Sequence, residues 1–202
     1  MFAFIEAAGW PVWPLVLASI ISLAIIGERA WSLRSSIVAP PELLGQIVQE
    51  YRQNGANPPL LARLTDGAPL AQIFAAGLKN VTSTPQVMKE AIDDAGRAVA
   101  HELERFLTTL GTIASISPLL GLFGTVIGMI EIFGAQAPTG GTNPALLAHG
   151  ISVSLYNTAF GLVVAIPSLI FYRHFRGKVD SLVIEMEQQA VRFVDIVHGV
   201  RK

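Results

Sequence analysis

Apolar residues are concentrated in three long segments that contain no Asp, Glu, Lys, Arg or His: residues 7–27, 106–130 and 150–172. Each segment matches the roughly 20 apolar residues that a helix needs to cross a bilayer. Soluble helices of this length usually have a polar face, and these segments have none. Three buried helices of a soluble bundle are the alternative interpretation. The pattern favours an all-α polytopic membrane protein with three transmembrane helices.

The remaining residues divide the chain around these three spans. We expect a lead-in and first transmembrane helix at 1–28, a helical domain at 29–105, a second transmembrane helix at 106–133, an external loop at 134–149, a third transmembrane helix at 150–172 and a C-terminal helix at 173–202. In this layout one soluble domain, at 29–105, lies between the first and second membrane helices and contains most of the charged residues.

Cations follow the first and third spans, whereas the loop 134–149 has no Lys or Arg. The cations that we expect to act as topology anchors are Arg29, Arg34, Arg173, Arg176 and Lys178. Cytoplasmic loops carry an excess of Lys and Arg, so the N-terminus is expected outside and the C-terminus in the cytoplasm. A role of the last three cations in anchoring to lipid headgroups is favoured over a binding site.

Prolines punctuate the region 29–105 and predict short helices. We expect helices at 41–53, 59–64 and 69–78, and a longer helix that begins at Pro85 with Thr84 as its N-cap. Pro118 is the only strong break between residues 86 and 133, so one helix roughly 70 Å long is expected to leave the domain and cross the membrane. A final amphipathic helix is expected at 180–200. No segment has a convincing β pattern.

The second and third apolar segments each carry a stripe of small residues at helical spacing. The first stripe contains Gly111, Ala114, Pro118, Gly121, Thr125 and Gly128, and the second contains Ser154, Thr158, Gly161, Ala165 and Ser168. Small residues let two membrane helices approach closely. We therefore expect Gly121, Gly124, Gly128 and Gly161 to be packing positions. Leucine at Gly124 or Gly128 should disrupt assembly.

The hydroxyl groups on these stripes allow two interpretations. In the first, Thr and Ser side chains bond back to their own helices within a close helix contact. In the second, the two helices share a polar pathway. Its lining residues would be Thr125, Thr158, Ser154 and Asn157. Matched stripes on two helices joined by a short loop favour the pathway.

Composition narrows the chemistry that the chain can perform. Cys is absent, which excludes disulfides, thiolate metal sites and thiol catalysis. The four histidines lie outside the spans without metal-ligand spacing, and the spans contain neither paired carboxylates nor a base beside a nucleophile. A net charge of −1 without a basic run gives no indication of a nucleic-acid partner. We therefore expect no enzyme, no metal and no cofactor.

No side chain that titrates near neutral pH lies at mid-membrane depth in the spans. Glu131 lies near the outer end of the second span, at the outer mouth, where it either gathers cations, pairs across subunits or lies at headgroup level. Proton and cation transporters usually keep a carboxylate or a His at depth, because a titratable group must bind and release the ion. If this chain serves an ion pathway, a partner helix must supply that carboxylate.

Two runs of residues closely resemble the second and third membrane helices of the MotA/TolQ/ExbB family. The first leads from Glu104-Arg105-Phe106-Leu107 into residues 117–130, Ser-Pro-Leu-Leu-Gly-Leu-Phe-Gly-Thr-Val-Ile-Gly-Met-Ile. The second occupies residues 149–167, with Tyr-Asn-Thr-Ala-Phe-Gly at its centre. Three spans and an external N-terminus resemble ExbB and TolQ rather than the four-span flagellar stator.

The resemblance implies a homopentamer in the bacterial inner membrane around a central pore. That pore would enclose helices of an ExbD- or TolR-like partner, which carries the proton-binding Asp. Proton flow would then energise a TonB- or TolA-like protein for transport across the outer membrane. Thr125 and Thr158 match the family's pore-lining threonines, whereas Val153 stands where many ExbB and TolQ sequences have Glu. An ExbB-like role is the leading expectation. A TolQ-like role in envelope integrity and a non-conducting membrane scaffold are the alternatives.

Overall fold

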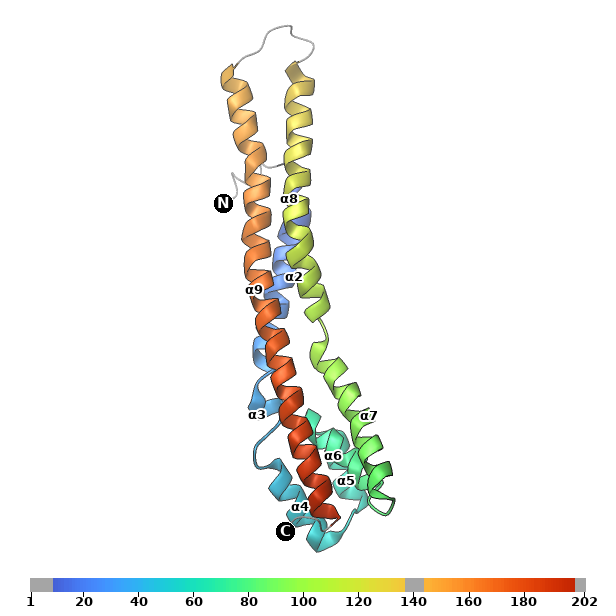
Figure 1. The fold of residues 1–202 in the computed structure, drawn as a ribbon. Coiled ribbons are helices and arrows are strands. Elements are labelled where there is room, and N and C mark those ends of the chain that lie inside the picture. The colour runs from blue at the N-terminus through green and yellow to red at the C-terminus, as the bar shows by residue number, and fades with distance from the viewer. Residues whose placement is uncertain (1–8, 137–143, 199–202) are drawn as a thin grey trace. The chain divides into compact units, whose positions relative to one another are not determined.

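The structure, a computed structural model, describes residues 9–136 and 144–198. Within these residues the regular structure is helical, without strands, as predicted. The helices are α2 (Val12–Ser32), α3 (Ser35–Val38), α4 (Leu43–Asn54), α5 (Pro58–Thr65), α6 (Pro69–Lys79), α7 (Pro85–Glu104), α8 (Leu107–Gln136) and α9 (Pro144–Val197) (Figure 1). Part of the predicted lead-in and part of the predicted loop fall at residues 1–8 and 137–143, outside the described residues.

The chain forms two compact units. The first unit combines Met1–Glu28 with Phe106–His174, and the second combines Arg29–Arg105 with Phe175–Lys202. The first unit therefore contains most of α2, all of α8 and the N-terminal part of α9. The second contains α3 to α7 and the C-terminal part of α9.

Three helical stretches are long and apolar enough to cross a membrane. They are Val12–Ser32 and stretches within Pro85–Gly134 and Gly150–Val197. Large apolar side chains on them stay exposed in the single chain, including Leu17, Leu23 and Leu119. Such apolar surface is expected where a helix faces lipid or another subunit. The prediction of three membrane-length helices is confirmed.

The helices of the first unit are joined by aromatic and hydroxyl contacts. The ring of Trp10, just before α2, meets the ring of Phe123 on α8 edge-on, with 6.3 Å between ring centroids. The buried hydroxyls of Ser22 on α2 and Ser168 on α9 lie 2.6 Å apart, and either one can be the donor. A hydrogen bond between membrane helices contributes on the order of 1 kcal/mol, so this pair holds α2 against α9.

The second unit is built around α6, whose residues are mostly buried. Phe74 of α6 packs against Phe193 of α9, with 4.8 Å between ring centroids. A side chain at Gly77 would meet Ile92 of α7 and the same Phe193, each at 3.0 Å. The absence of a side chain at Gly77 therefore lets α6 approach α7 and α9 closely.

Two helix starts in the second unit have side-chain caps, and one of them, at Thr84, was predicted. The Asn57 side chain accepts a hydrogen bond from the Leu60 backbone N–H at 2.8 Å and caps α5. Thr84 caps α7 by accepting from the Val87 N–H at 3.4 Å, as predicted. In both helices proline occupies the first turn, where its missing N–H would have had no partner. The predicted helices at 41–53, 59–64 and 69–78 correspond to α4, α5 and α6 within two residues at each end.

The predicted single helix from residue 86 to residue 133 is wrong, because the chain breaks between α7 and α8. Arg105 is extended, with φ −49° and ψ 141°, and Phe106 has a φ of 64°. A left-handed conformation is unusual for a bulky residue without special support. The α8 helix then restarts at once, since the Leu110 N–H donates to the Phe106 carbonyl at 3.0 Å.

Arg29, predicted as a topology anchor, lies buried at this break with only 5% of its surface exposed. Its Nη1 donates to the backbone carbonyl of Leu103 at 3.1 Å. Leu103 is in the last turn of α7, where carbonyls have no partner within the helix and a cation is favourable. The Arg29 side chain therefore acts as a C-terminal cap of α7. The residue that caps this end of α7 lies 74 residues away in the sequence.

We expect Arg29→Met to loosen the end of α7, because it removes a charged hydrogen bond to the Leu103 carbonyl. The local free energy of opening should fall by about 1.5–3 kcal/mol. Amide hydrogen exchange over residues 99–105 measures this change. Arg34→Met is the control, because Arg34 is exposed and stacks over the Trp31 ring at 4.3 Å instead of binding a helix end. Equal exchange rates in wild type and Arg29→Met would contradict the capping role.

The α9 helix is longer than predicted. We expected a loop at 134–149 and separate helices at 150–172 and 180–200, but α8 continues to Gln136 and α9 runs unbroken over 54 residues. Residues 173–178 contain good helix formers around an isolated Gly177, and an isolated glycine weakens a helix without ending it. Pro118 and Pro167 also lie inside helices. Prolines are tolerated in membrane helices, where neighbouring groups satisfy the freed carbonyls.

Candidate functional site

The backbones of α8 and α9 meet in the first unit at two glycines. A Cβ atom built on Gly121 would lie 2.7 Å from the Asn157 carbonyl oxygen, and one built on Gly161 would lie 2.6 Å from the Ser117 carbonyl oxygen. Real Cβ atoms do not approach other atoms this closely. Since the clashing atoms belong to the backbone, no rotamer change relieves them. Glycine is therefore required on both helices at this level.

The other two packing glycines meet polar side chains of α9. A Cβ at Gly124 would lie 2.9 Å from the Cβ of Asn157, and a Cβ at Gly128 would collide with the Ser154 hydroxyl oxygen. The structure thus places Gly121, Gly124, Gly128 and Gly161 in one contact between α8 and α9. Further along, a Cβ built on Gly111 would lie 3.1 Å from the nearest ring carbon of Tyr172.

Two threonine hydroxyls join α8 to α9 within this contact. Thr125 Oγ1 and Thr158 Oγ1 lie 2.5 Å apart, and either one can donate. Thr125 Oγ1 also reaches two backbone carbonyls, that of Gly121 at 3.1 Å and that of Ser154 at 3.4 Å. Both threonines are half-buried. The two stripes therefore meet in register, with one threonine opposite the other.

Ser154 and Asn157 extend this polar cluster along α9. Both are 2% exposed, and both face the glycines of α8. The Ser154 hydroxyl oxygen makes no hydrogen bond within the described residues. A buried hydroxyl without a partner is costly and usually has a ligand, a water or a function. The four predicted pathway residues thus form one cluster on facing helices.

The cluster contains hydroxyls and an amide but no carboxylate, amine or imidazole. Glu131, the nearest acidic residue along α8, is exposed and lies six residues beyond Thr125, about 9 Å along the helix axis. A hydroxyl both donates and accepts hydrogen bonds, but it does not ionise near neutral pH. The site can therefore orient a proton carrier or a water, and it cannot itself hold the proton.

Comparison with known proteins defines the family of the chain. Residues 66–188, which include α6 to α8, most of α9 and the whole polar cluster, match the sequence model of the MotA/TolQ/ExbB proton channel family. The chain belongs to this family. It is thus a membrane protein of the ExbB/TolQ kind.

Relatives of both kinds match most of the chain. A protein of Synechocystis sp. named as ExbB-like 3 for biopolymer transport is 35% identical over 175 residues, which cover 85% of this chain and 82% of the relative. The biopolymer transport protein exbB1 of Vibrio cholerae is 33% identical over 81% of this chain and 74% of its own. The Tol-Pal system protein TolQ of Pseudomonas aeruginosa is 32% identical over 91% of this chain and 84% of its own. Identity alone does not separate the two kinds.

The cations predicted as anchors have different environments in this ExbB/TolQ family member. Arg29 caps α7 and Arg34 stacks on Trp31, as described above. Arg176 lies 3.7 Å from the carboxylate of Glu104, within the second unit. Arg173 is exposed and Lys178 is half-buried.

Sequence reasoning missed three contacts of the site and its surroundings: the Ser22–Ser168 pair, the Gly111–Tyr172 contact and the Arg29 cap. A serine within an apolar span was the available signal for Ser22, since a buried hydroxyl needs a partner. No local signal marked Arg29 as buried.

Proposed function

We propose that this chain is an ExbB-like subunit of an inner-membrane motor driven by the proton-motive force. Five copies would surround helices of an ExbD-like single-span partner, and the motor would energise a TonB-like protein for transport across the outer membrane. The first unit would lie in the membrane and the second in the cytoplasm, with the N-terminus periplasmic. The relatives named for biopolymer transport support this proposal. We propose no enzymatic activity.

The observation that carries the proposal is the Thr125–Thr158 pair, set in two spans that have no carboxylate at mid-membrane depth. A proton path through a membrane needs a group that binds and releases the proton. The partner's Asp would provide that group. The threonine pair would provide hydrogen bonds to it in both of its states, because a hydroxyl can donate to a carboxylate and accept from a carboxylic acid.

Ser154 supports the proposal that this chain provides hydrogen bonds while the partner provides the proton-binding group. Its hydroxyl is buried, lies one turn from Thr158 and makes no hydrogen bond within the described part of the chain. With the threonine pair it would form a short series of hydroxyls along α9. Such a series can orient a water beside the partner's carboxylate.

Reconstitution of the chain with an ExbD-like single-span protein from the same organism tests the proposal. The purified complex, placed in proteoliposomes under an imposed membrane potential, should take up protons, as measured with an internal pH dye. The chain alone should show only the leak of empty liposomes. Asn in place of the partner's intramembrane Asp should abolish uptake without changing the mass of the complex. Equal uptake with and without the partner, or with the Asn variant, would refute the proposal.

A TolQ-like role in envelope integrity is the nearest alternative, since TolQ of Pseudomonas aeruginosa matches over more of the chain than exbB1 of Vibrio cholerae does. Deletion of the gene separates the two roles. Loss of siderophore-dependent iron uptake supports the ExbB-like role, and sensitivity to detergent supports the TolQ-like role.

A non-conducting scaffold is the second alternative. Val153, beside Ser154 on α9, stands where the resemblance places a Glu in many ExbB and TolQ sequences. A scaffold would assemble with its partner but would show no proton uptake in the reconstitution described above.

A further inference from the structure

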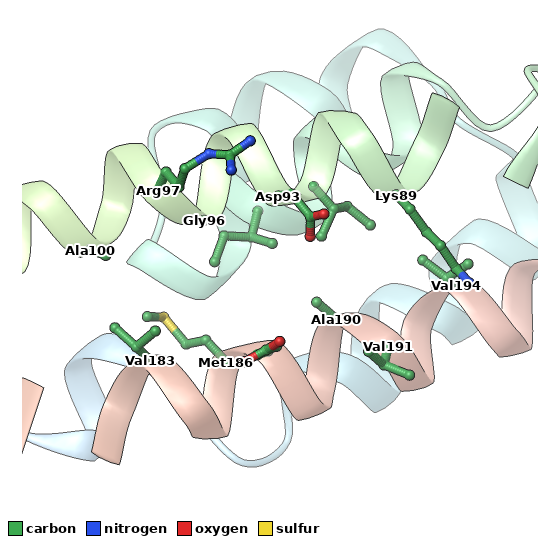
Figure 2. A pocket seen from close by; sticks show the side chains of 13 residues that line it. Lys89, Asp93, Gly96, Arg97, Ala100, Val183, Met186, Ala190, Val191 and Val194 are labelled. Carbon is green, nitrogen blue, oxygen red and sulfur yellow. The ribbon is translucent and has the colours of Figure 1, made fainter. Parts of the chain in front are cut away.

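The second unit contains a cavity of about 450 Å³ between α7 and the C-terminal part of α9, which we call the α7–α9 groove (Figure 2). Its lining runs from Lys89 to Ala100 on α7 and from Val183 to Val194 on α9. Each stretch covers three helical turns, about 16 Å. The groove is therefore long enough to receive a helix of three turns lying along α7 and α9.

The floor of the groove is apolar and contains small residues. Ile73, Ile92 and Met186 contribute apolar surface, and Gly96 and Ala190 leave space between the two helices. A Cβ built on Gly96 would have no neighbouring atom within 4 Å, so an alanine would fit there. Glycine inside a helix costs about 1 kcal/mol relative to alanine. Because Gly96 has no side chain, the backbone of another helix can approach the floor of the groove at this position.

The rim of the groove carries two cations, Lys89 and Arg97, and two carboxylates, Asp93 and Glu187. Lys89, Asp93 and Glu187 line the groove and make no hydrogen bond or ion pair within residues 9–136 and 144–198. Arg97, on the same rim, is occupied by Asp94, to which its Nη2 donates at 2.7 Å. In Figure 2 the Asp93 carboxylate points into the gap between the helices. Since Arg97 is held mainly by Asp94, with a weaker attraction to Asp93, the carboxylates of Asp93 and Glu187 face one unpaired cation, Lys89. This excess of negative charge, spread over both walls, favours a cationic occupant.

Both walls are acidic as a whole. The α7 helix has five acidic residues and only two basic ones, Lys89 and Arg97. Residues 180–197 of α9 have four acidic residues and only one basic one, Arg192. A second copy of α7 or of this part of α9 would therefore bring like charge to the groove, which is destabilising. The charge pattern therefore favours a basic helix over either of these acidic segments of another copy.

We propose that the α7–α9 groove is the docking site for a basic amphipathic helix of a partner protein. Apolar residues of that helix, spaced at i, i+3 or i+4 and i+7, lie on the floor beside Gly96 and Ala190, as in other helix-in-groove complexes. Its Lys or Arg side chains pair with Asp93 and Glu187. This docking site is separate from the threonine pair and does not depend on the proposed motor function.

A designed peptide pair tests the docking site. Both fluorescent peptides have about 18 residues, which is enough to form a helix. They share the same apolar face of Leu and Ala residues. At the positions that flank this face, one peptide has Lys and the other has Glu. The full-length protein, purified as its oligomer in nanodiscs of zwitterionic lipid, is titrated against each peptide, with fluorescence anisotropy as the readout and empty nanodiscs as the blank. The Lys peptide should bind saturably and at least about tenfold more tightly than the Glu peptide, a difference of about 1.4 kcal/mol.

Matched variants place the binding in the groove. Gly96→Leu fills the floor, and Gly45→Leu makes the same change in α4, where a Cβ also has no atom within 4 Å. Asp93→Lys and Glu187→Lys reverse the rim charge, and Asp180→Lys makes the same reversal on α9 outside the lining. The three groove variants should weaken binding of the Lys peptide about tenfold or more, and the two controls less than about twofold.

Three results would overturn the proposal. They are no saturable binding of the Lys peptide, equal affinity for the Glu peptide, and wild-type affinity in all groove variants. Native mass measurement is made on every variant. A change of oligomeric mass in Gly96→Leu without peptide binding to the wild type would identify the groove as a contact between copies, and would also refute a partner helix.

Discussion

Replacing Gly121 with alanine will destabilise the first unit by about 1–3 kcal/mol, and leucine will separate α8 from α9. The added Cβ would lie 2.7 Å from the Asn157 carbonyl oxygen and 3.0 Å from the Thr158 Cα. Both neighbours are backbone atoms, so the helices must move apart to admit even one methyl group. Gly161→Ala should have an effect of similar size, because its Cβ would lie 2.6 Å from the Ser117 carbonyl oxygen.

Thermal unfolding of the purified protein in detergent, followed by circular dichroism, measures this change, and native mass measurement reports whether oligomers persist. Gly134→Ala is the matched control, because Gly134 lies in the same helix and its Cβ would have no atom within 4 Å. In a helix such an exchange is neutral or slightly stabilising. Equal melting temperatures for Gly121→Ala and Gly134→Ala would show that the two backbones do not touch in the assembled protein.

Thr125→Val should reduce proton uptake by the reconstituted complex about tenfold or more, equivalent to about 1.4 kcal/mol. Valine keeps the shape of threonine but removes the hydroxyl that contacts Thr158. Thr158→Val should have the same effect, and the double variant should be little worse than either single one, because the two hydroxyls act as a pair. Thr125→Ser keeps the hydroxyl and should retain most of the activity.

Assembly must be measured beside uptake, because a lost interhelical hydrogen bond also costs some stability, on the order of 0.6 kcal/mol. Thr112→Val is the control on the same helix. Its hydroxyl donates to the Thr108 carbonyl at 2.8 Å and is exposed, so its loss should leave uptake unchanged. Wild-type uptake in both Thr125→Val and Thr158→Val would count against a proton path along these residues.

The membrane-length helices and the small-residue stripes could be predicted because they depend on local spacing. Uncharged runs of about 20 residues predict spans, and steps of three and four residues place Gly121 and Thr125 on one helix face. The caps at Asn57 and Thr84 are also local, since each side chain binds an N–H three residues ahead. Features that depend on a single short segment of the chain can thus be predicted from its residue types alone.

The features that sequence reasoning missed depend on residues far apart in the chain. Arg105 and Phe106 contain no helix-breaking residue, and the end of α7 is capped by a side chain 74 residues earlier. Pro118, by contrast, was expected on a helical stripe and lies inside α8. The register of the two stripes could not be predicted from the sequence either. Thr125 lies opposite Thr158 only because Gly121 and Gly161 let the two helices approach closely.

The threonine pair has a further consequence, which follows from its lack of a fixed direction. When Thr125 donates to Thr158, the hydroxyl hydrogen of Thr158 is available to a neighbouring acceptor. When Thr158 donates instead, the hydroxyl hydrogen of Thr125 turns to the carbonyl of Gly121 or Ser154. The two arrangements differ by rotation about two C–O bonds, with every heavy atom in place. A rigid wall of two helices can therefore reverse its local polarity without moving its backbone.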